Sequence, residues 1–460
     1  MTTAEKAGNQ DRNNILDGAL SKAVWTLSWP LMVRMAAVSI ASFTDILIAG
    51  RMGPDTQAAI GICAQIWFLF LMLTIALSAG TTALVSRFWG AGERENAMEA
   101  ARHSLAFATA FGVITIALGL VAARPLLRML GASPMVEDIA WSYIEIDILS
   151  QLPFTIVWIA HSITRATGDT RGPMKNWVIM TALIVSLDLA FCIYPLQMGV
   201  RGIALAWLIS SLVGVVLALK LIAGSELRES LSLKRNISQG FSRQWLERIL
   251  KIGLPACITD LAWSAGCFAL LLIFASTAHP TQCQASWAIG LRMEEIVSYM
   301  PIYALSTAVA TIVGQNLGAG KLDRARRAGW LVCAVGIGIT TLVSLILYTA
   351  ASPLAALLSQ DSLVIAYTTQ YFQIIGLSQP FVASWIILFG AMQGAGYTKW
   401  PMWASLIGFA LIRLPLAYGL TRGIPDGPTG CWIAFAVTSV VLGIVAAWKY
   451  RRGNWQLQTV

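Results

Sequence analysis

Two aspartates stand inside apolar stretches that are long enough to cross a membrane. Asp45 lies near the end of LSWPLMVRMAAVSIASFTDILIAG (27–50), and Asp188 lies in ALIVSLDLAFCIYP (182–195). A carboxylate at the centre of a bilayer costs about 2.5–3.5 kcal/mol even on the most lenient insertion scale, so its presence there indicates a function. The chemistry open to such a group is the binding of a proton or a cation. We therefore take Asp45 and Asp188 as the candidate proton- or cation-binding residues.

A proline shares the first of these stretches. Pro30 stands fifteen residues before Asp45, which is about 22 Å along a helix at 1.5 Å per residue. Proline removes one helix hydrogen bond and clashes with the preceding turn, so a bend is expected there. Pro30 is therefore a candidate hinge that moves the helix when the acids are protonated. A static kink that only fits the bundle is the alternative.

The composition is that of an integral membrane protein. The chain is 57% hydrophobic and only 12% charged, whereas soluble domains average roughly 25% charged residues. Seven cysteines and three histidines are scattered without metal-ligand spacing, so no metal site is expected. No nucleotide-binding loop or nucleophile–base pair appears, so we expect no enzymatic activity and no cofactor. The net charge of +9 needs no nucleic acid partner, because basic loops account for it.

The hydropathy pattern predicts twelve helical spans of about 20 residues each. They fall near 22–47, 57–83, 101–122, 136–162, 174–196, 200–222, 249–274, 284–312, 326–350, 366–392, 399–420 and 429–449. Most of the 32 basic residues fall in the termini and in every second loop, which predicts that both termini are cytoplasmic. The expected parts are an N-terminal tail (1–21), a first six-helix bundle (22–223), a cytoplasmic linker (224–248), a second six-helix bundle (249–449) and a C-terminal tail (450–460).

The second half of the chain repeats the first at an offset of 228 residues. The matched positions are Gly90-Ala91-Gly92 with Gly318-Ala319-Gly320, Ser150-Gln151 with Ser378-Gln379, the turns 166–174 and 394–402, and Gly199 with Gly427. Six spans per repeat is an even number, so each half ends on the side where it began. This predicts two parallel bundles related by a pseudo-twofold axis along the membrane normal, with a cleft between them that opens alternately to each side.

These residues resemble the multidrug and toxic compound extrusion transporters over nearly the whole chain. The motifs that carry the resemblance are FTDILIAGRMG, GTTALVSRFWGAGE, RATGDTRGPM, VGQNLGAGKLDRAR and GAMQGAGYTKWPM. The pattern is most similar to the branch that includes the DNA-damage-inducible protein F. The resemblance implies cation- or proton-coupled export of amphipathic, often cationic compounds.

Within that resemblance, Asp45 matches the carboxylate of the first helix and Asp188 matches the fifth-helix aspartate of proton-coupled members. Both lie in the outward halves of their spans, where two carboxylates in one dry pocket repel and one of them is driven to hold a proton. The asparagines that the family commonly places before the fifth-helix aspartate are replaced here by Ile184 and Thr181. A sodium ion needs about six oxygen ligands, and isoleucine supplies none. This departure favours the proton over sodium.

The second bundle holds further candidate acids. The seventh-helix glutamate of many family members is replaced by Trp263, and Asp260 stands three residues earlier. Glu294 and Glu295 enter the eighth span, where one is expected to face the cleft while the other pairs with Arg292. Five deep tryptophans are candidate substrate contacts through stacking and cation–π interactions, with ordinary packing as the alternative: Trp67, Trp158, Trp263, Trp287 and Trp385.

The expected function is proton-coupled antiport of small amphipathic or cationic molecules by a monomer in the bacterial inner membrane, in contact with membrane lipid. A dedicated exporter of one endogenous metabolite, such as a siderophore, is the main alternative. A lipid-precursor flippase is less favoured, because its cleft is expected to be cationic and the deep charges in this sequence are mostly acidic.

Overall fold

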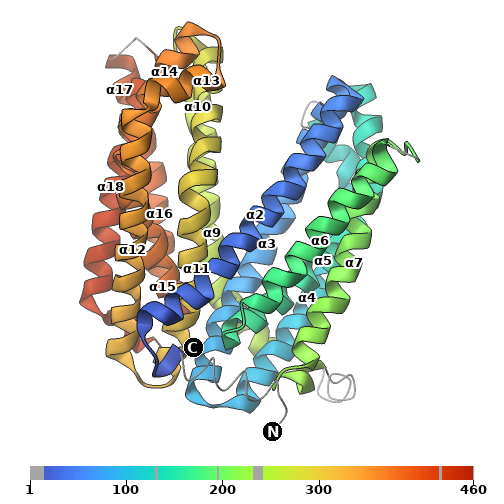
Figure 1. Cartoon of the computed structure of the whole chain (residues 1–460), viewed down its shortest axis with the longest axis vertical. Coiled ribbons are helices and arrows are strands. Elements are labelled where there is room, and N and C mark those ends of the chain that lie inside the picture. Colours follow the sequence, from blue (N-terminus) through green and yellow to red (C-terminus); the bar gives the residue numbers. More distant parts are fainter. Residues whose placement is uncertain (1–14, 130–132, 194–195, 232–241, 424–426, 459–460) are drawn as a thin grey trace. The chain divides into compact units, whose positions relative to one another are not determined.

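The computed structural model describes residues 15–129, 133–193, 196–231, 242–423 and 427–458, and these form helices and turns with no strand among them (Figure 1). Eleven helices are long and apolar enough to cross a membrane. One further pair of helices, bent by 54° at a short break, passes the same test together and raises the number of spans to as many as twelve. The predicted all-α membrane fold is confirmed.

The chain divides into two compact units, Met1–Leu254 and Pro255–Val460. The helices of the first unit are α2 (Leu20–Met52), α3 (Pro54–Ala91), α4 (Arg94–Met129), α5 (Pro134–Thr167), α6 (Arg171–Asp188), the π-helical turn η1 (Leu189–Ile193), α7 (Val200–Ala223) and the 3-10 turn η2 (Arg228–Leu231). Helix α9 (Arg243–Phe274) starts in the first unit and ends in the second.

The second unit continues with shorter pieces that follow the same order. They are α10 (Pro280–Glu294), the π-helical turn η3 (Glu295–Tyr299), α11 (Met300–Gly318), α12 (Leu322–Thr349), α13 (Ala351–Leu358), α14 (Ser362–Gly376), α15 (Gln379–Gly394), α16 (Lys399–Leu406), the π-helical turn η4 (Ile407–Arg413), α17 (Leu414–Gly423), α18 (Thr429–Arg452) and the 3-10 turn η5 (Asn454–Leu457).

The repeated glycines mark matched turns. Gly92 after α3 and Gly320 after α11 both have positive φ, at 79° and 72°, and Gly168 after α5 matches Gly396 after α15, at 107° and 79°. Positive φ ends a helix and is strained for residues with a Cβ. The sequence repeat with its offset of 228 residues therefore reflects helices that end at matched positions in the two halves of the chain.

The start of α9 differs from the expected linker. Helix α9 begins at Arg243, and its first turns belong to the first unit up to Leu254. Two glycines let the backbones of α3 and α9 approach closely: a Cβ on Gly80 would lie 2.3 Å from the carbonyl oxygen of Ile249, and one on Gly253 would lie 2.0 Å from that of Ala76. The first part of α9 is thus packed against α3 of the first unit, and its first residues, 243–248, lie in the stretch predicted as a linker.

The bend between α14 and α15 has a local cause. Pro380 lies in the first turn of α15, where its missing N–H cannot continue the hydrogen bonding of the preceding helix.

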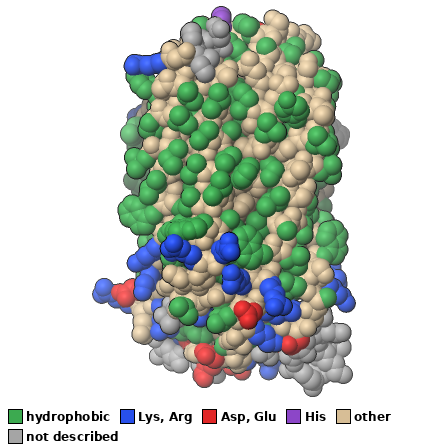
Figure 2. Space-filling model, turned by 90° about the vertical axis from the view of Figure 1, so that its left-hand side faces the viewer, with side chains coloured by type: hydrophobic (Ala, Val, Ile, Leu, Met, Phe, Trp, Pro, Cys, Tyr) green, Lys and Arg blue, Asp and Glu red, His purple; other side chains and the backbone are tan. Residues whose placement is uncertain are grey.

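On the face that Figure 2 shows, hydrophobic side chains are spread over much of the surface, and Lys and Arg side chains gather towards the lower end. This distribution is the one expected of a membrane protein with one basic side.

Candidate functional site

Asp45 of α2 and Asp188 of α6 are brought together in the first unit. Asp188 is fully buried and is the last residue of α6, directly before η1. The two carboxyl groups interact electrostatically, and Trp207 of α7 donates a hydrogen bond from Nε1 to Asp45 Oδ2 at 2.9 Å. Oδ1 of Asp45 and both oxygens of Asp188 have no hydrogen-bond partner in the described part of the chain.

A third acid joins this pair. Asp147 of α5 is buried and interacts electrostatically with Asp45, and Ser150 donates a hydrogen bond to Asp147 Oδ1 at 3.3 Å. The hydroxyl of Tyr143, one turn earlier on α5, interacts electrostatically with the same three carboxyl groups. None of these acids forms an ion pair with a Lys or Arg side chain of the described residues. We call Asp45, Asp188, Asp147, Tyr143 and Trp207 the acidic centre of the first unit.

The sequence reading missed part of this centre. The sequence alone singled out neither Asp147 nor Trp207 as a site residue. The periodicity of a helix indicates which residues share a face, but whether that face turns to the bundle or to lipid depends on its neighbours. A usable signal was present for Asp147, because it lies one turn before Gln151 on the face that the repeat motif marks.

The residues around Asp188 supply few cation ligands. Ile184 is fully buried one turn before Asp188, and the Thr181 hydroxyl donates to the Ala37 carbonyl oxygen at 3.1 Å. The N–H of Trp207 occupies one oxygen of Asp45, which leaves fewer oxygens open to an ion. Pro30 is buried inside the continuous helix α2, whose first turns run at an angle to the rest in Figure 1.

The acids of the second unit lie in separate places. Glu294 ends α10 directly before η3 and is 1% exposed, and Gln379 of α15 donates a hydrogen bond to its Oε1 at 2.7 Å. Glu295 is exposed and pairs with Arg292 at 2.9 Å. Asp260 of α9 lies beside Tyr303 of α11. The structure therefore joins neither Asp260 nor Glu295 to Glu294.

Glu294 belongs to a buried polar group that includes an arginine. Arg413, the last residue of η4, is 1% exposed and interacts electrostatically with Glu294 and with the hydroxyls of Tyr299 and Tyr371. Its guanidinium carbon lies 4.0 Å from the ring centre of Phe435. π-Helical turns are rare and often mark functional sites. In the described part of the chain there are three, of which η1 follows Asp188, η3 follows Glu294 and η4 ends with Arg413.

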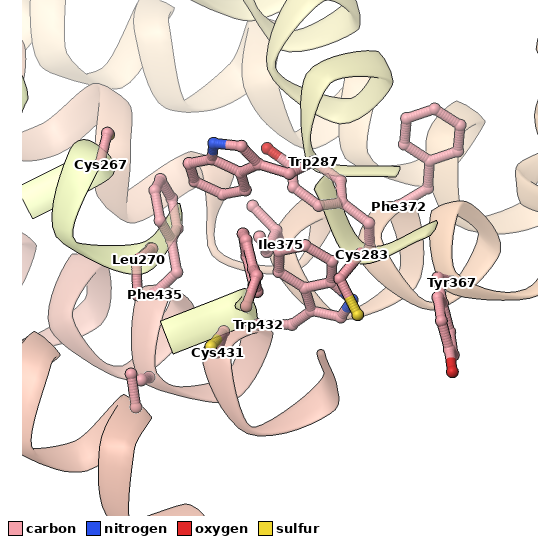
Figure 3. Packing of buried hydrophobic residues seen from close by; sticks show 14 of the residues in the cluster. Cys267, Leu270, Cys283, Trp287, Tyr367, Phe372, Ile375, Cys431, Trp432 and Phe435 are labelled. Atoms are coloured by element: carbon pink, nitrogen blue, oxygen red, sulfur yellow. The ribbon is translucent and has the colours of Figure 1, made fainter. Parts of the chain in front are cut away.

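The five deep tryptophans all pack against aromatic rings. Trp67 meets Phe154 at 5.3 Å between ring centres, Trp158 meets Trp177 at 6.5 Å, Trp263 meets Tyr299 at 5.9 Å, Trp287 meets Trp432 at 5.7 Å, and Trp385 meets Phe389 at 5.6 Å. Figure 3 shows Trp287 with Trp432 and Phe435 in the core of the second unit. Trp287 and Trp385 are buried and fill the core, while Trp67, Trp158 and Trp263 are half-buried.

Comparison with known proteins decides the family. The MatE family model matches residues 30–192 and 255–419, one segment in each half of the chain. The chain belongs to the MatE family. This is a family of membrane transporters and not of enzymes, and the resemblance inferred from the motifs is confirmed. Membership of the branch that includes the DNA-damage-inducible protein F stays a prediction.

Individual MatE relatives match over almost their full length. A protein of Thermotoga maritima named "Probable multidrug resistance protein NorM" is 26% identical, with 96% of this chain and 94% of that protein covered. A protein of Shewanella oneidensis named "FAD transporter" is 24% identical over 96% of this chain and 97% of its own length. The crystal structure of a variant of the Vibrio cholerae MATE transporter VcmN is 22% identical, covers 95% of this chain and 99% of that one, and superposes with a TM-score of 0.88.

Proposed function

We propose that this MatE transporter exports small amphipathic molecules from the bacterial cytoplasm by antiport with protons, with both of its termini in the cytoplasm. The observation that carries the proposal is the acidic centre of the first unit. The centre holds three carboxyl groups, of which Asp147 and Asp188 are buried and Asp45 is half-buried, and none has an ion-pair partner among the described residues. Asp45 interacts electrostatically with both of the others. Like charges this close cannot all stay ionised in an apolar bundle, so positive charge must enter with them.

A proton suits this centre better than a sodium ion. Ile184 offers no ligand, and Trp207 already donates to Asp45. A proton needs only one carboxyl oxygen, whereas a hard cation needs about six oxygens in a shell around it. Release of the proton on one side of the membrane restores repulsion between Asp45 and Asp188, and this repulsion biases the position of α2 against α6. Such a bias is what couples a gradient to a conformational change.

The direct test uses purified protein in liposomes with a panel of amphipathic dyes. An imposed pH gradient with sodium absent is expected to drive dye transport, and an imposed sodium gradient with the pH clamped is expected to drive none. Transport driven by sodium alone would overturn proton coupling. Transport unaffected by either gradient would overturn antiport.

A second candidate function is the dedicated export of one endogenous metabolite. One similar protein is named "FAD transporter", a name that refers to a metabolite and not to drugs. A specific feature of the first unit also favours it, because Arg34 of α2 and Arg165 of α5 are buried there and a cationic substrate would not need them. A lipid-precursor flippase would use the same basic groups, but it remains a weaker alternative because it has no need of the three carboxyl groups of the acidic centre.

A further inference from the structure

The first unit holds a second group of buried charges, and these are basic. Arg34 of α2 is 7% exposed, and His161 and Arg165 of α5 are 1% and 5% exposed. The two guanidinium groups act on each other electrostatically, and both act on His161. Arg34 stands eleven residues before Asp45, about 16 Å along α2, so this basic cluster is separate from the acidic centre. The deep charges of this unit are therefore not only acidic, because Arg165, which follows the expected span 136–162, is buried on α5.

Neither arginine has a carboxylate partner among the described residues. Arg34 makes no hydrogen bond there, its Nε is buried, and its guanidinium carbon lies 5.4 Å from the ring centre of Trp158. Arg165 donates from Nη2 to the Ser162 hydroxyl at 3.0 Å, and its Nε has no partner. Buried charges in proteins are normally paired and hydrogen-bonded, because removing them from water is costly. Two adjacent arginines without an acid therefore indicate a place for an anion.

His161 adds a third hydrogen-bond donor to this cluster. Asn176 of α6 donates from Nδ2 to the Gly214 carbonyl oxygen at 2.9 Å, and this bond fixes which end of the amide is nitrogen. The same Nδ2 lies 2.9 Å from His161 Nε2. An amide nitrogen only donates, so Nε2 accepts and the ring proton is on Nδ1. His161 Nδ1 is buried and has no partner, so its N–H is available to a ligand.

The matched positions of the second unit show that helix packing does not require this cluster. They hold Ala262 in place of Arg34, Phe389 in place of His161 and Gln393 in place of Arg165. Helix α5 packs against α3, α4 and α7, and α15 packs against the matched helices α11, α12 and α18 with Phe389 and Gln393 in place. The basic groups are thus an addition to the first unit and not part of the shared architecture.

We propose that Arg34, Arg165 and His161 bind a phosphate group, carried either by the exported molecule or by a lipid. Guanidinium groups match the oxygens of phosphate with directed, charge-assisted hydrogen bonds. The donors come from two helices, α2 and α5, and approach from different directions, which suits the several oxygens of a phosphate better than a single halide ion. The claim that the exported molecule carries the phosphate rests on the proposed export function. The claim that these residues bind phosphate does not depend on that function.

The test compares probes that differ by one phosphate in phospholipid-free detergent. The soluble pair is flavin mononucleotide against riboflavin, the lipid pair is phosphatidic acid against diacylglycerol, and inorganic phosphate is the smallest probe. Affinity is measured from the shift of thermal unfolding with probe concentration. We expect tighter binding of the phosphate-bearing member in at least one pair. A response to flavin mononucleotide assigns the site to soluble substrates, and a response to phosphatidic acid assigns it to lipid. Equal binding within both pairs and no response to inorganic phosphate overturn the proposal.

Variants tie the binding to these residues. Arg34→Gln is expected to weaken binding of the phosphate-bearing probe by about 30-fold or more, as the loss of one partner in a buried charged contact does. Arg34→Lys is expected to retain part of the affinity, and His161→Gln serves where Arg34→Gln fails to fold. Arg292→Gln is the matched control, because Arg292 is exposed and paired with Glu295. Unchanged discrimination in both Arg34→Gln and His161→Gln would overturn the assignment.

The test is independent of proton coupling. Asp45→Asn is expected to leave phosphate binding intact, because the acidic centre lies elsewhere on α2. If Asp45→Asn blocks proton-driven efflux while Arg34→Gln leaves binding unchanged, only the phosphate site is refuted. If phosphate binding depends on Arg34 but no proton gradient drives efflux, only the proposed coupling is refuted.

Discussion

Ser78 of α3 and Ser306 of α11 occupy matched positions in the two units, 228 residues apart, and each contacts the helix that follows two spans later. In the first unit Ser78 bonds the Ser162 hydroxyl at 2.7 Å, and Ser162 donates to the Trp158 carbonyl oxygen. In the second unit position 390 is glycine, and Ser306 itself donates to the carbonyl oxygen of Ile386, which matches Trp158. In both units a serine hydroxyl therefore binds the carbonyl oxygen at this matched position, but the serine lies on α5 in the first unit and on α11 in the second.

The same comparison applied to charge gives the opposite result. The first unit carries acids without bases at one level of the bundle and bases without acids at another. The second unit instead places Glu294 near Arg413 and bonds it to Gln379. The contrast teaches that the shared packing sets the helix arrangement, while the charge pattern differs: Glu294 has a basic neighbour in Arg413, and the acids of the acidic centre and the arginines of the basic cluster have no partner of opposite charge among the described residues.

The largest expected effect is on the acidic centre of the first unit. Asp45→Asn is expected to reduce gradient-driven efflux to the level of protein-free liposomes, because the remaining acids no longer release and rebind a proton against Asp45. Insertion and thermal stability are expected to change little, since the amide still accepts the Trp207 hydrogen bond. Efflux is measured with an imposed pH gradient, with Glu295→Gln as an exposed acid control. Normal coupled efflux by the variant would remove the distinction between the units.

A smaller effect on transport is expected at Pro30. Pro30→Ala restores one helix hydrogen bond and stiffens α2, so a hinge predicts slower transport with substrate affinity and thermal stability near those of the unaltered protein. Pro255→Ala is the control, because Pro255 also lies inside a long helix, α9, and this variant is expected to leave transport nearly unchanged. Transport rates are compared at saturating dye. Equal rates for Pro30→Ala and the unaltered protein would show that the bend is architectural.

The Glu294→Gln variant tests whether Glu294 only stabilises the fold or takes part in proton coupling. The change leaves Arg413 without its charged neighbour, which is expected to lower stability by about 1–3 kcal/mol, while efflux remains driven by the pH gradient. The stability is measured by thermal unfolding in detergent. Adding Arg413→Met to Glu294→Gln is expected to recover most of the loss. A variant that folds well but has lost coupling would instead place a coupling acid in the second unit.

The smallest effect concerns a packing contact that has a large and a small residue in both units, with the large one on the opposite helix in the second unit. Met180 of α6 lies against Gly214 of α7, where a Cβ would be 2.5 Å from the methionine sulfur, and the matched pair in the second unit is Gly408 against Leu442. Gly214→Leu is expected to destabilise the protein by about 1–3 kcal/mol through overpacking. Adding Met180→Gly reproduces the pair of the second unit and is expected to restore part of the loss in thermal unfolding. A double variant no more stable than the single one would show that the two helix crossings differ in geometry.

The sequence by itself determined the class of the fold and its repeat. Runs of apolar residues separated by charged turns admit only membrane helices, because the bilayer leaves no other way to satisfy a spanning backbone. The 228-residue offset of the glycine turns followed from local backbone geometry, which glycine encodes directly. Asp45, Asp188 and Glu294 were also recognisable, since an acid in an apolar run needs no structure to stand out.

Only the tertiary structure decided which polar side chains meet. The bond from Trp207 to Asp45 joins residues 162 positions apart, and the inward turn of Asp147 and Arg165 depends on how α5 is rotated against its neighbours. A helix in a membrane has a lipid face and a bundle face of similar hydropathy, so amphipathicity does not fix that rotation as it does for a soluble helix. The packing of small residues such as Gly80 and Gly214 fixes it instead, and those contacts exist only once the helices have assembled.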